Sequence, residues 1–380
     1  MNPYDFVRID WSKPPVRRRP IWHNRLFGKD MPQLYSGQLE VDVITETPLF
    51  IFATEDASSE DTREPARFAY SAQSDYIIPG STLKGMLRNV VEALGNGCLT
   101  LFDERYRGKG NTERIDYRSK VPREFQHCSD LNELCIACRT FGMLRERSQG
   151  VFLGKVNIGD AVIYEDKIYT YDPIYTKPLM EPKPYHASFY LDEKEQRIAG
   201  RKFYFHHSAK LEPLTENGPI HFGKTLANRY IEPLDYGSEF HFRVDFTNLE
   251  VDEFRALLQA IVLDDKMRHK IGYGKPLGLG TIELRPACLT LIDYAARYST
   301  DPGANRGKTI YEGDKLWDYL YDRLNEFADS GLVKMAMEDL GRIWRWPPEP
   351  NVAYHYPDKR GWFDTKGRGK RIADTRISPG

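Results

Sequence analysis

The chain has 380 residues, of which 41% are hydrophobic and 29% charged, a composition that excludes an overall disordered or fibrous protein. A chain of this length is expected to form about two to three structural units, or one domain with large insertions. Its formal net charge of -1 excludes a uniformly basic, polyanion-binding protein. The charge is uneven, however, because residues 1–31 carry a net charge of +4 and residues 341–380 one of +5. These basic ends predict either terminal arms that contact phosphates or solvated tails.

No apolar segment typical of a secretion signal follows Met1, and the aliphatic stretch 257–263 is too short to span a bilayer. We therefore expect a cytoplasmic protein that does not bind a membrane. Five cysteines in such a chain favour thiols or metal ligands over disulfides.

The first predicted unit is a strand followed by an amphipathic helix. Apolar and acidic residues alternate over 39–43, which is typical of a half-buried strand. The turn Pro79-Gly80-Ser81 opens a helix that Gly95-Asn96-Gly97 ends. Its apolar positions share one face, so the opposite face, with Lys84 and Arg88 one turn apart, is expected to lie in solvent.

The second predicted unit repeats this order after a long irregular segment. Residues 151–164 indicate a further strand, and 163–233 are rich in Tyr, Pro and charge. Alternation resumes at 240–246, with Asn248 as the expected cap or turn before a helix over 254–262, and a glycine-rich run at 271–280 leads into another strand. These units predict an α+β fold with a ferredoxin-like sheet and long insertions. Two further helices are expected at 315–328 and 332–345, before a basic tail.

Three cysteines in the pattern Cys128-x6-Cys135-x2-Cys138 predict a structural zinc site. A fourth ligand is needed, and both Cys98 and His127 are available, although His127 is the more strained choice because it adjoins Cys128. The alternatives are free structural thiols or a redox pair. No nearby residue supplies a general base for a zinc-bound water, so a catalytic zinc is not expected.

Two turns are candidates for contact with phosphates. The helix start at 78–85 presents backbone N–H groups beside Ser81 and Lys84, but it lacks the pattern of a Walker loop or of a dinucleotide-binding turn. The run 272–280 precedes a strand rather than a helix, which argues against a nucleotide site and for close approach of another backbone. The residues alone leave phosphate contact and plain turn chemistry open at both places.

Five ordered blocks of the sequence resemble the motifs of the RAMP superfamily. They are 78–88 (IPGSTLKGMLR), 135–142 (CIACRTFG), 150–160 (GVFLGKVNIGD), 200–206 (GRKFYFH) and 269–284 (HKIGYGKPLGLGTIEL). The pattern is most similar to the backbone subunit of type III CRISPR-Cas effector complexes, over about residues 37–290. Residues 293–380 lie outside the resemblance.

The resemblance implies a ferredoxin-like (RRM-type) palm at 37–292 that carries a zinc-stapled insertion (98–149) and a thumb-like hairpin insertion (163–235). A basic N-terminal arm (1–36) and a helical C-terminal extension with a basic tail (293–380) flank it. It further implies that copies of this subunit or related ones stack along a CRISPR RNA with other effector subunits. The implied zinc ligands are Cys98, Cys128, Cys135 and Cys138, and the implied RNA-binding residues are Gly80, Ser81, Lys84, Arg88, Arg201, Lys202, Lys270 and Lys275.

Related backbone subunits often cut single-stranded target RNA with an acidic residue in the loop before the Pro-Gly turn. Here that loop, 54–75, holds Asp61 and Glu64 as candidates for binding Mg²⁺ or Mn²⁺. The family position falls near Glu64, where an aspartate is usual, and this departure leaves endoribonuclease activity open. The alternatives are a non-catalytic RNA-binding scaffold, or a RAMP-like nuclease that processes guide RNA with His206 and His207.

Overall fold

A computed structural model describes the chain from residue 1 to 380 apart from a set of gaps. The gaps are residues 22–32, 54–63, 101–115, 145–149, 180–186, 193, 195, 208–214, 223–224, 302, 304, 329–333, 351, 357–371 and 373–380. Among the described residues, none of the helices combines the length and the apolar character that crossing a membrane requires.

A mixed α+β fold is built on one antiparallel sheet in the order β15–β16–β2–β14–β7–β3, with β6 also paired to β14 and β17 to β16. Its long central strands are β2 (Leu34–Thr45), β14 (Glu239–Glu250) and β16 (Thr281–Ile292). Alternate residues of each strand are buried, because one face of the sheet packs on helices. The predicted α+β class with antiparallel pairing is therefore confirmed.

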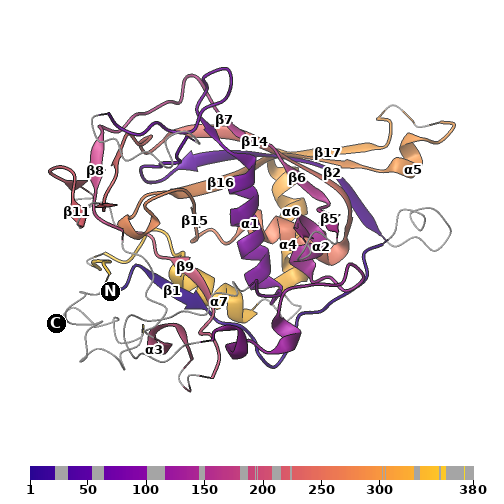
Figure 1. The fold of residues 1–380 in the computed structure, drawn as a ribbon. Helices are drawn as coiled ribbons and strands as arrows, with labels where there is room; N and C mark the ends of the chain where they lie inside the picture. Colours follow the sequence, from indigo (N-terminus) through magenta and orange to yellow (C-terminus); the bar gives the residue numbers. More distant parts are fainter. Residues whose placement is uncertain are drawn as a thin grey trace.

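The helices α1 (Gly80–Leu94) and α4 (Val251–Val262) cover the buried face of the sheet, and α6 (Gly313–Ala328) packs next to α4 (Figure 1). The bounds of α1 match the prediction from its Pro-Gly start and its glycine-rich end. Helix α4 begins differently. Glu250 and Glu253 form a reciprocal capping box, whereas Asn248 lies in a bulge of β14 with a φ of 54°.

Smaller elements surround this core. They are β1 (Tyr4–Val7), β3 (Ile77–Ile78), α2 (Ile136–Phe141), β4 (Gly142–Leu144), β5 (Val151–Leu153), β6 (Val156–Ile158), β7 (Ala161–Ile163), β8 (Ile174–Thr176), α3 (Ala187–Tyr190), β9 (Arg201–Tyr204), β10 (Thr215–Glu216), β11 (His221–Phe222), β12 (Thr225–Leu226), β13 (Tyr230–Ile231), β15 (His269–Lys270), α5 (Tyr294–Arg297), β17 (Lys308–Glu312) and α7 (Lys334–Ile343). The single strand predicted over 151–164 is three short strands, because the chain turns at Gly154 and Gly159 between them.

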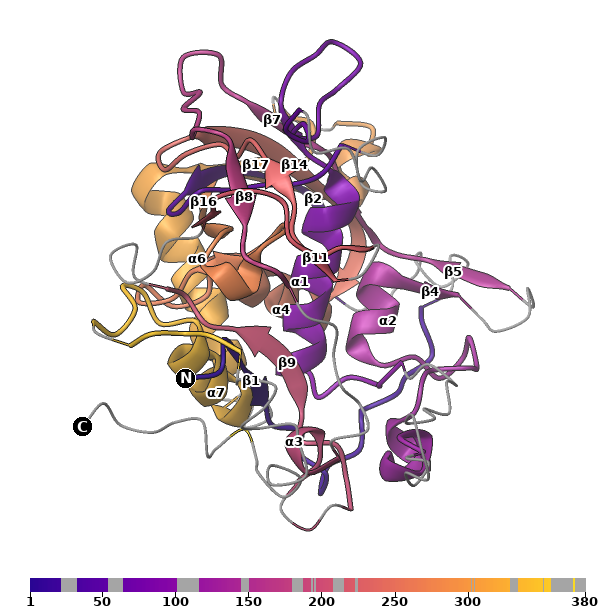
Figure 2. The same cartoon turned by 60° about the vertical axis from the view of Figure 1, so that its left-hand side comes forward.

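The N-terminal strand β1 pairs with β9, and α7 packs against both on the side of the helices away from the sheet (Figures 1 and 2). An ion pair of 2.9 Å between Arg8 Nε and Asp339 Oδ2 links the N-terminal segment to α7. The two helices predicted beyond residue 293 are present as α6 and α7. The two ends of the described chain therefore meet on the same side of the core.

Candidate metal centre and nucleic-acid interface

Four cysteines, Cys98, Cys128, Cys135 and Cys138, meet in one buried cluster. Their sulfur atoms all lie within 4.8 Å of one another, and the Sγ atoms of Cys98 and Cys138 are 3.7 Å apart. Four thiols at these separations suit tetrahedral coordination of an ion such as Zn²⁺. Hydrogen bonding within the cluster lowers the pKa of Cys135, chiefly through Cys128, and raises the pKa of Cys98 and of Cys138, because four clustered thiols cannot all ionise without a cation among them.

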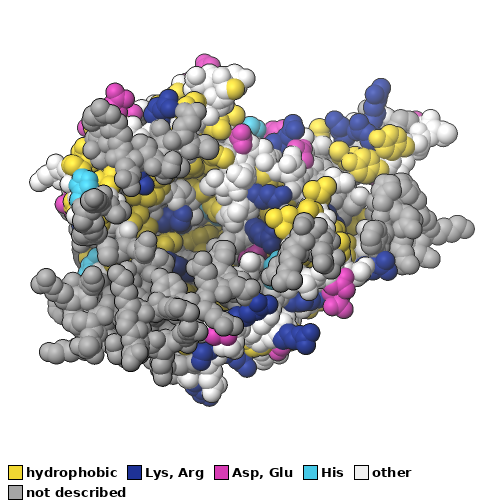
Figure 3. Space-filling model, viewed as in Figure 1, with side chains coloured by type: hydrophobic (Ala, Val, Ile, Leu, Met, Phe, Trp, Pro, Cys, Tyr) yellow, Lys and Arg dark blue, Asp and Glu magenta, His cyan; other side chains and the backbone are white. Residues whose placement is uncertain are grey.

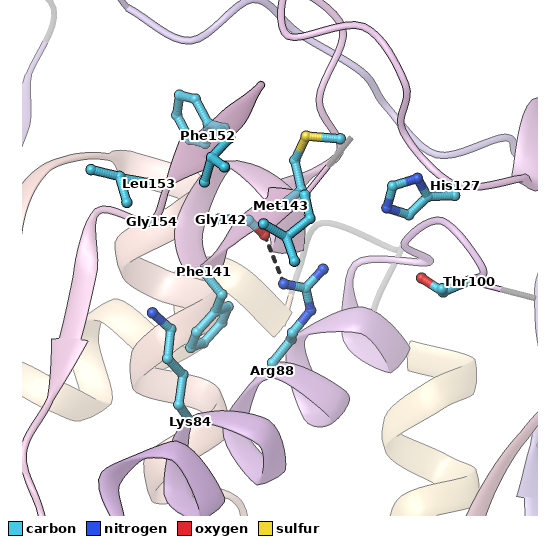
Figure 4. Close-up of a pocket in the computed structure, with 12 residues that line it drawn as sticks. Lys84, Arg88, Thr100, His127, Phe141, Gly142, Met143, Phe152, Leu153 and Gly154 are labelled. Carbon is cyan, nitrogen blue, oxygen red and sulfur yellow. Dashed lines mark hydrogen bonds between the residues drawn. The ribbon is translucent and has the colours of Figure 1, made fainter. Parts of the chain in front are cut away.

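Local structure places each thiol. Cys98 follows the turn that ends α1, and Cys135 is the residue at the N-terminal cap of α2, which carries Cys138 in its first turn. The backbone N–H of Cys135 donates to Cys128 Sγ over 3.3 Å. Among the described residues the cluster takes Cys98 as its fourth member, while His127 points into the pocket beside it (Figure 4).

Two arginines tie this cluster to α1. Arg88 places Nη2 3.6 Å from Cys138 Sγ, and Arg201 donates from Nη2 to the carbonyl oxygen of Cys98 over 2.8 Å. Both pair with Glu92, at 2.8 Å from Arg88 Nε and 2.9 Å from Arg201 Nη1. Four thiolates around a divalent cation carry a net charge of -2, so nearby guanidinium groups stabilise the loaded site.

An open pocket of about 560 Å³ lies between α1 and the β4–β5 hairpin (Figure 4). Lys84, Arg88 and His127 line it together with apolar residues of the hairpin, of which Leu144 and Leu153 are 70% and 82% exposed. Lys84 Nζ donates to the carbonyl oxygen of Val156 over 3.2 Å, which leaves its other protons available. The pocket thus combines a cation at its base with apolar walls.

Lys84 and Arg88 were expected on a solvent-facing side of α1, and the structure corrects this. Both are half-buried, because the insertion folds back over that side, and Arg88 Nη1 donates to the carbonyl oxygen of Gly142 over 2.7 Å. Burial, with a smaller contribution from Arg88, lowers the pKa of Lys84.

The N-terminus of α1 already holds an anion. The N–H of Gly80 donates to Asp160 Oδ1 over 2.7 Å, so this amide is engaged by a carboxylate from the turn between β6 and β7. Ser81 is exposed next to it. Sequence reasoning did not single out Asp160, although it closes one of the quoted blocks.

The glycine-rich loop 272–280 is held by buried lysines. Lys270 is 5% exposed and donates from Nζ to the carbonyl oxygen of Gly278 and to Thr281 Oγ1, at 2.9 and 3.0 Å. Lys275 Nζ donates to the carbonyl oxygen of Gly272. Only glycine fits at 280, where φ is +79° and a Cβ would lie 1.9 Å from the oxygen of Ile271.

Lys202 lies above the rings of Tyr4 and Tyr204, with Nζ 3.9 and 4.6 Å from their centroids. Burial and the nearby charge of Lys275 lower the pKa of Lys202 to about 8. Burial also lowers the pKa of Lys270 and of Lys275, so the three lysines between β9 and the loop are all partly or wholly desolvated.

The two candidate histidines of the nuclease alternative lie at the end of β9. His206 is buried, and its ring nitrogens are bonded to Thr281 Oγ1 and the carbonyl oxygen of Arg268 at 3.0 and 2.9 Å. Burial lowers the pKa of His206 well below its usual value and that of His207 to about 3. Neutral, packed imidazoles of this kind suit structural roles better than proton transfer to a substrate.

Of the two candidate catalytic acids, Asp61 lies outside the described residues. Glu64 is the first described residue after that gap and is exposed. Metal-dependent RNA cleavage by the loop 54–75 therefore stays a prediction.

Arg139 is a residue that sequence reasoning missed. It is 1% exposed, follows Cys138 in α2 and bonds to Glu250, Glu253 and Asp252 at the start of α4, at 2.9, 2.8 and 3.1 Å. Lys155 Nζ adds a bond of 2.7 Å to Glu253. The only sequence signal was the place of Arg139 inside the block CIACRTFG.

A family model of the RAMP superfamily covers residues 42–283, and no curated protein matches the chain. The matched range spans well over half of the chain, and it contains β14, the end of β2, the start of β16, both sheet-covering helices, the cysteine cluster and the glycine-rich loop described above. The chain belongs to the RAMP superfamily.

Proposed function

We propose that this chain binds guide RNA as a repeated backbone subunit of a type III CRISPR-Cas effector complex. Membership in the RAMP superfamily indicates a CRISPR-associated, RNA-binding function. The observation that carries the finer proposal is the pocket on α1, where Lys84 lies at the base of apolar walls next to the cysteine cluster.

The strand order supports a ferredoxin-like palm. Strands β16–β2–β14 and the pair β6 and β7 lie side by side, and α1 and α4 follow the first and third of the strands in chain order. This is the order in which two β-α-β units interleave in one antiparallel sheet. Apart from β9, which pairs with β1, the described strands between β7 and β14 form small sheets of their own, which fits a thumb-like insertion.

Charge favours an RNA path on the α1 side rather than on the open face of the sheet. The open face carries acids such as Asp42, which accepts hydrogen bonds from Tyr164 and pairs with His241. In Figure 3, Lys and Arg side chains gather over the middle of the molecule in the region of α1, next to apolar side chains. A groove with cations for phosphates and apolar walls for bases tracks single-stranded RNA without reading its sequence.

We propose that some of the RNA-binding residues contact phosphates and that others hold the site in place. Ser81 and Lys84 are placed to meet phosphates directly, and Lys202 and Lys275 add positive charge beside the glycine-rich loop. We assign Gly80, Arg88, Arg201 and Lys270 to positioning, because their polar groups are bonded within the protein. The partners proposed are CRISPR RNA, target RNA, copies of this or related backbone subunits, and other effector subunits.

Replacing Lys84 with glutamine tests this interface. Because one phosphate contact is lost, we expect weaker binding to every RNA sequence and a fall of about 0.7 in the slope of log affinity against log salt. Fluorescence anisotropy with single-stranded RNA over a salt series measures both.

Lys315→Gln is the matched control, because Lys315 is exposed on α6 away from the pocket. It should leave the affinity and the slope unchanged. Equal effects of the two variants would show that Lys84 contributes only net charge. No RNA binding by the wild-type chain, and no RNA bound after purification, would overturn the function itself.

The endoribonuclease activity is a separate proposal, supported by the exposed carboxylate of Glu64 in the acidic loop. We expect Asp61→Asn or Glu64→Gln to abolish Mg²⁺- or Mn²⁺-dependent cuts in target RNA, since either acid would hold the ion. RNA affinity should stay unchanged, which gel analysis and anisotropy check together. Unaltered cutting by both variants would exclude Asp61 and Glu64 as the catalytic acids, and no cutting by the wild-type complex would leave a non-catalytic scaffold as the function.

A further inference from the structure

An arm projects from the body beyond the end of the central sheet. We refer to residues 293–312, which follow β16 and include α5 and β17, as the C-terminal arm. The arm extends at the upper right of Figure 1. The arm lies outside the residues that the RAMP superfamily model matches. The properties shared by the superfamily therefore do not account for it.

Two tyrosines of the C-terminal arm are open to solvent in a parallel arrangement. Tyr294 and Tyr298 lie one helical turn apart, with ring centroids separated by 6.2 Å and planes inclined by 10°. Tyr294 is 40% exposed and Tyr298 78%. Large aromatic rings usually bury most of their surface, so such a pair at the tip of a projecting arm indicates a binding surface.

Cations flank these rings. Arg306 and Lys308 are exposed, and among the described residues neither forms an ion pair. They lie close to α5, because the N–H of Asp293 donates to the oxygen of Gly307 and Gly307 packs directly on the backbone of Arg297. Two of the three acids of the arm serve its local structure, since Asp293 caps α5 and Asp301 accepts from the N–H of Gly303. The third, Glu312, lies at the end of β17, opposite Cys288 of β16.

We propose that the C-terminal arm is a second RNA contact, in which an unpaired base stacks on the Tyr294–Tyr298 pair and Arg306 and Lys308 meet the adjoining phosphates. Aromatic faces accept any base, and the chain segment that carries Arg306 and Lys308 lies against α5, where cations can meet the phosphates that flank a stacked base. A sequence-tolerant contact of this kind suits single-stranded RNA rather than a duplex, whose bases are already stacked. This inference rests on the proposed function, because it extends the RNA path from the pocket on α1 to the arm.

The variant Y294A/Y298A tests the stacking. We expect the affinity of the full chain for a fluorescein-labelled single-stranded RNA to fall about 5-fold or more, with no change in salt slope, because the lost contact is uncharged. The variant R306Q/K308Q should instead lower the slope, by about 1.4 for two phosphate contacts on a single strand. The pair Y294F/Y298F, which keeps both rings, should bind as the wild type does.

Tyr321→Ala is the matched control. Tyr321 is 45% exposed on α6, but it lies near Asp264 and Asp265. The negative charges of these two carboxylates would repel RNA phosphates. Its replacement should not change RNA affinity. Wild-type affinity in Y294A/Y298A would overturn the inference, and if that variant also changed the size of the assembled complex, the arm would be a protein contact instead. Loss of binding in Lys84→Gln with unchanged binding in Y294A/Y298A would overturn only the arm, whereas absent wild-type binding would overturn the proposed function.

Discussion

Cys135→Ser is expected to abolish metal binding and to unfold the segment around α2. Cys135 is the N-terminal cap of α2 and one of four cysteines whose sulfur atoms lie within 4.8 Å of one another. Structural zinc contributes roughly 10–16 kcal/mol of apparent binding free energy, which also acts as folding energy. Metal analysis of protein purified without chelator should find about one ion per chain in the wild type and almost none in the variant. Thermal unfolding should show a large loss of stability.

Cys288→Ser is the matched control for this change. Cys288 lies on β16, outside the cluster, and is half-buried. Its replacement should leave the metal content and the unfolding transition unchanged. In the loaded wild type a thiol reagent should modify Cys288 first, and the four cluster thiols should react only after chelation. Wild-type protein without metal, in which all cysteines react at one rate, would contradict the assignment.

Arg88 connects the cysteine cluster to the proposed RNA-binding pocket. Arg88 bonds at once to Cys138 Sγ, Glu92 and the backbone of Gly142, where the β4–β5 hairpin begins. The hairpin forms the wall of the pocket opposite Lys84. A metal that fixes Cys138 therefore also fixes the pocket, and chelation should weaken RNA binding without removing a single cation from the path.

Elements with local signals could be predicted from the sequence. The Pro-Gly turn and the Gly95-Asn96-Gly97 end fixed the bounds of α1, and alternation located β2 and β14, because such signals involve neighbours in the chain. The start of α4 was less accurate. Asn248 is a common cap residue, but here Glu250 and Glu253 cap each other, and the bulge in β14 uses Asn248.

The surroundings of side chains could not be predicted in the same way. The spacing of apolar residues on α1 predicted that Lys84 and Arg88 face solvent. This prediction was wrong, because the insertion at 98–149 folds back over that side of the helix. The choice between Cys98 and His127 also required the path of this insertion, since both were available in the sequence. The cysteine spacing nevertheless predicted correctly that Cys128, Cys135 and Cys138 lie together, because the C-x2-C pattern at the start of a helix places both of its thiols on one side.

The role of Arg139 could not be predicted from the sequence, because its partners Glu250, Asp252 and Glu253 lie more than a hundred residues further along the chain. The contact joins α2, which contains Cys138 and is capped by Cys135, to the capping box of α4. The cysteine-bearing insertion is thus attached to the core through a buried charge cluster as well as through α1.

Arg139→Met is expected to lower the free energy of unfolding by about 3–5 kcal/mol. Methionine keeps much of the apolar volume, so the loss reports the charge left behind rather than a cavity. Glu253 is fully buried, and burial already raises its pKa despite Lys155 and Arg139. Without Arg139 the carboxylate is less compensated, so its folded-state pKa rises further. The folded variant then takes up a proton at Glu253 more readily than the unfolded chain does, so lowering the pH stabilises it. The difference in free energy of unfolding between the variant and the wild type should therefore become smaller as the pH falls toward the pKa of Glu253. Urea unfolding at a series of pH values measures this.

The double variant R139M/E253Q separates electrostatics from packing. Glutamine at 253 can still accept the N–H of Glu250, so the cap of α4 is retained while the buried charge is removed. The double variant should therefore be more stable than Arg139→Met alone near neutral pH, and its stability should no longer approach that of the wild type as pH falls. Additive losses in the two single variants, with no coupling between them, would mean that Arg139 acts by filling space and that its bonds to Glu253 contribute nothing.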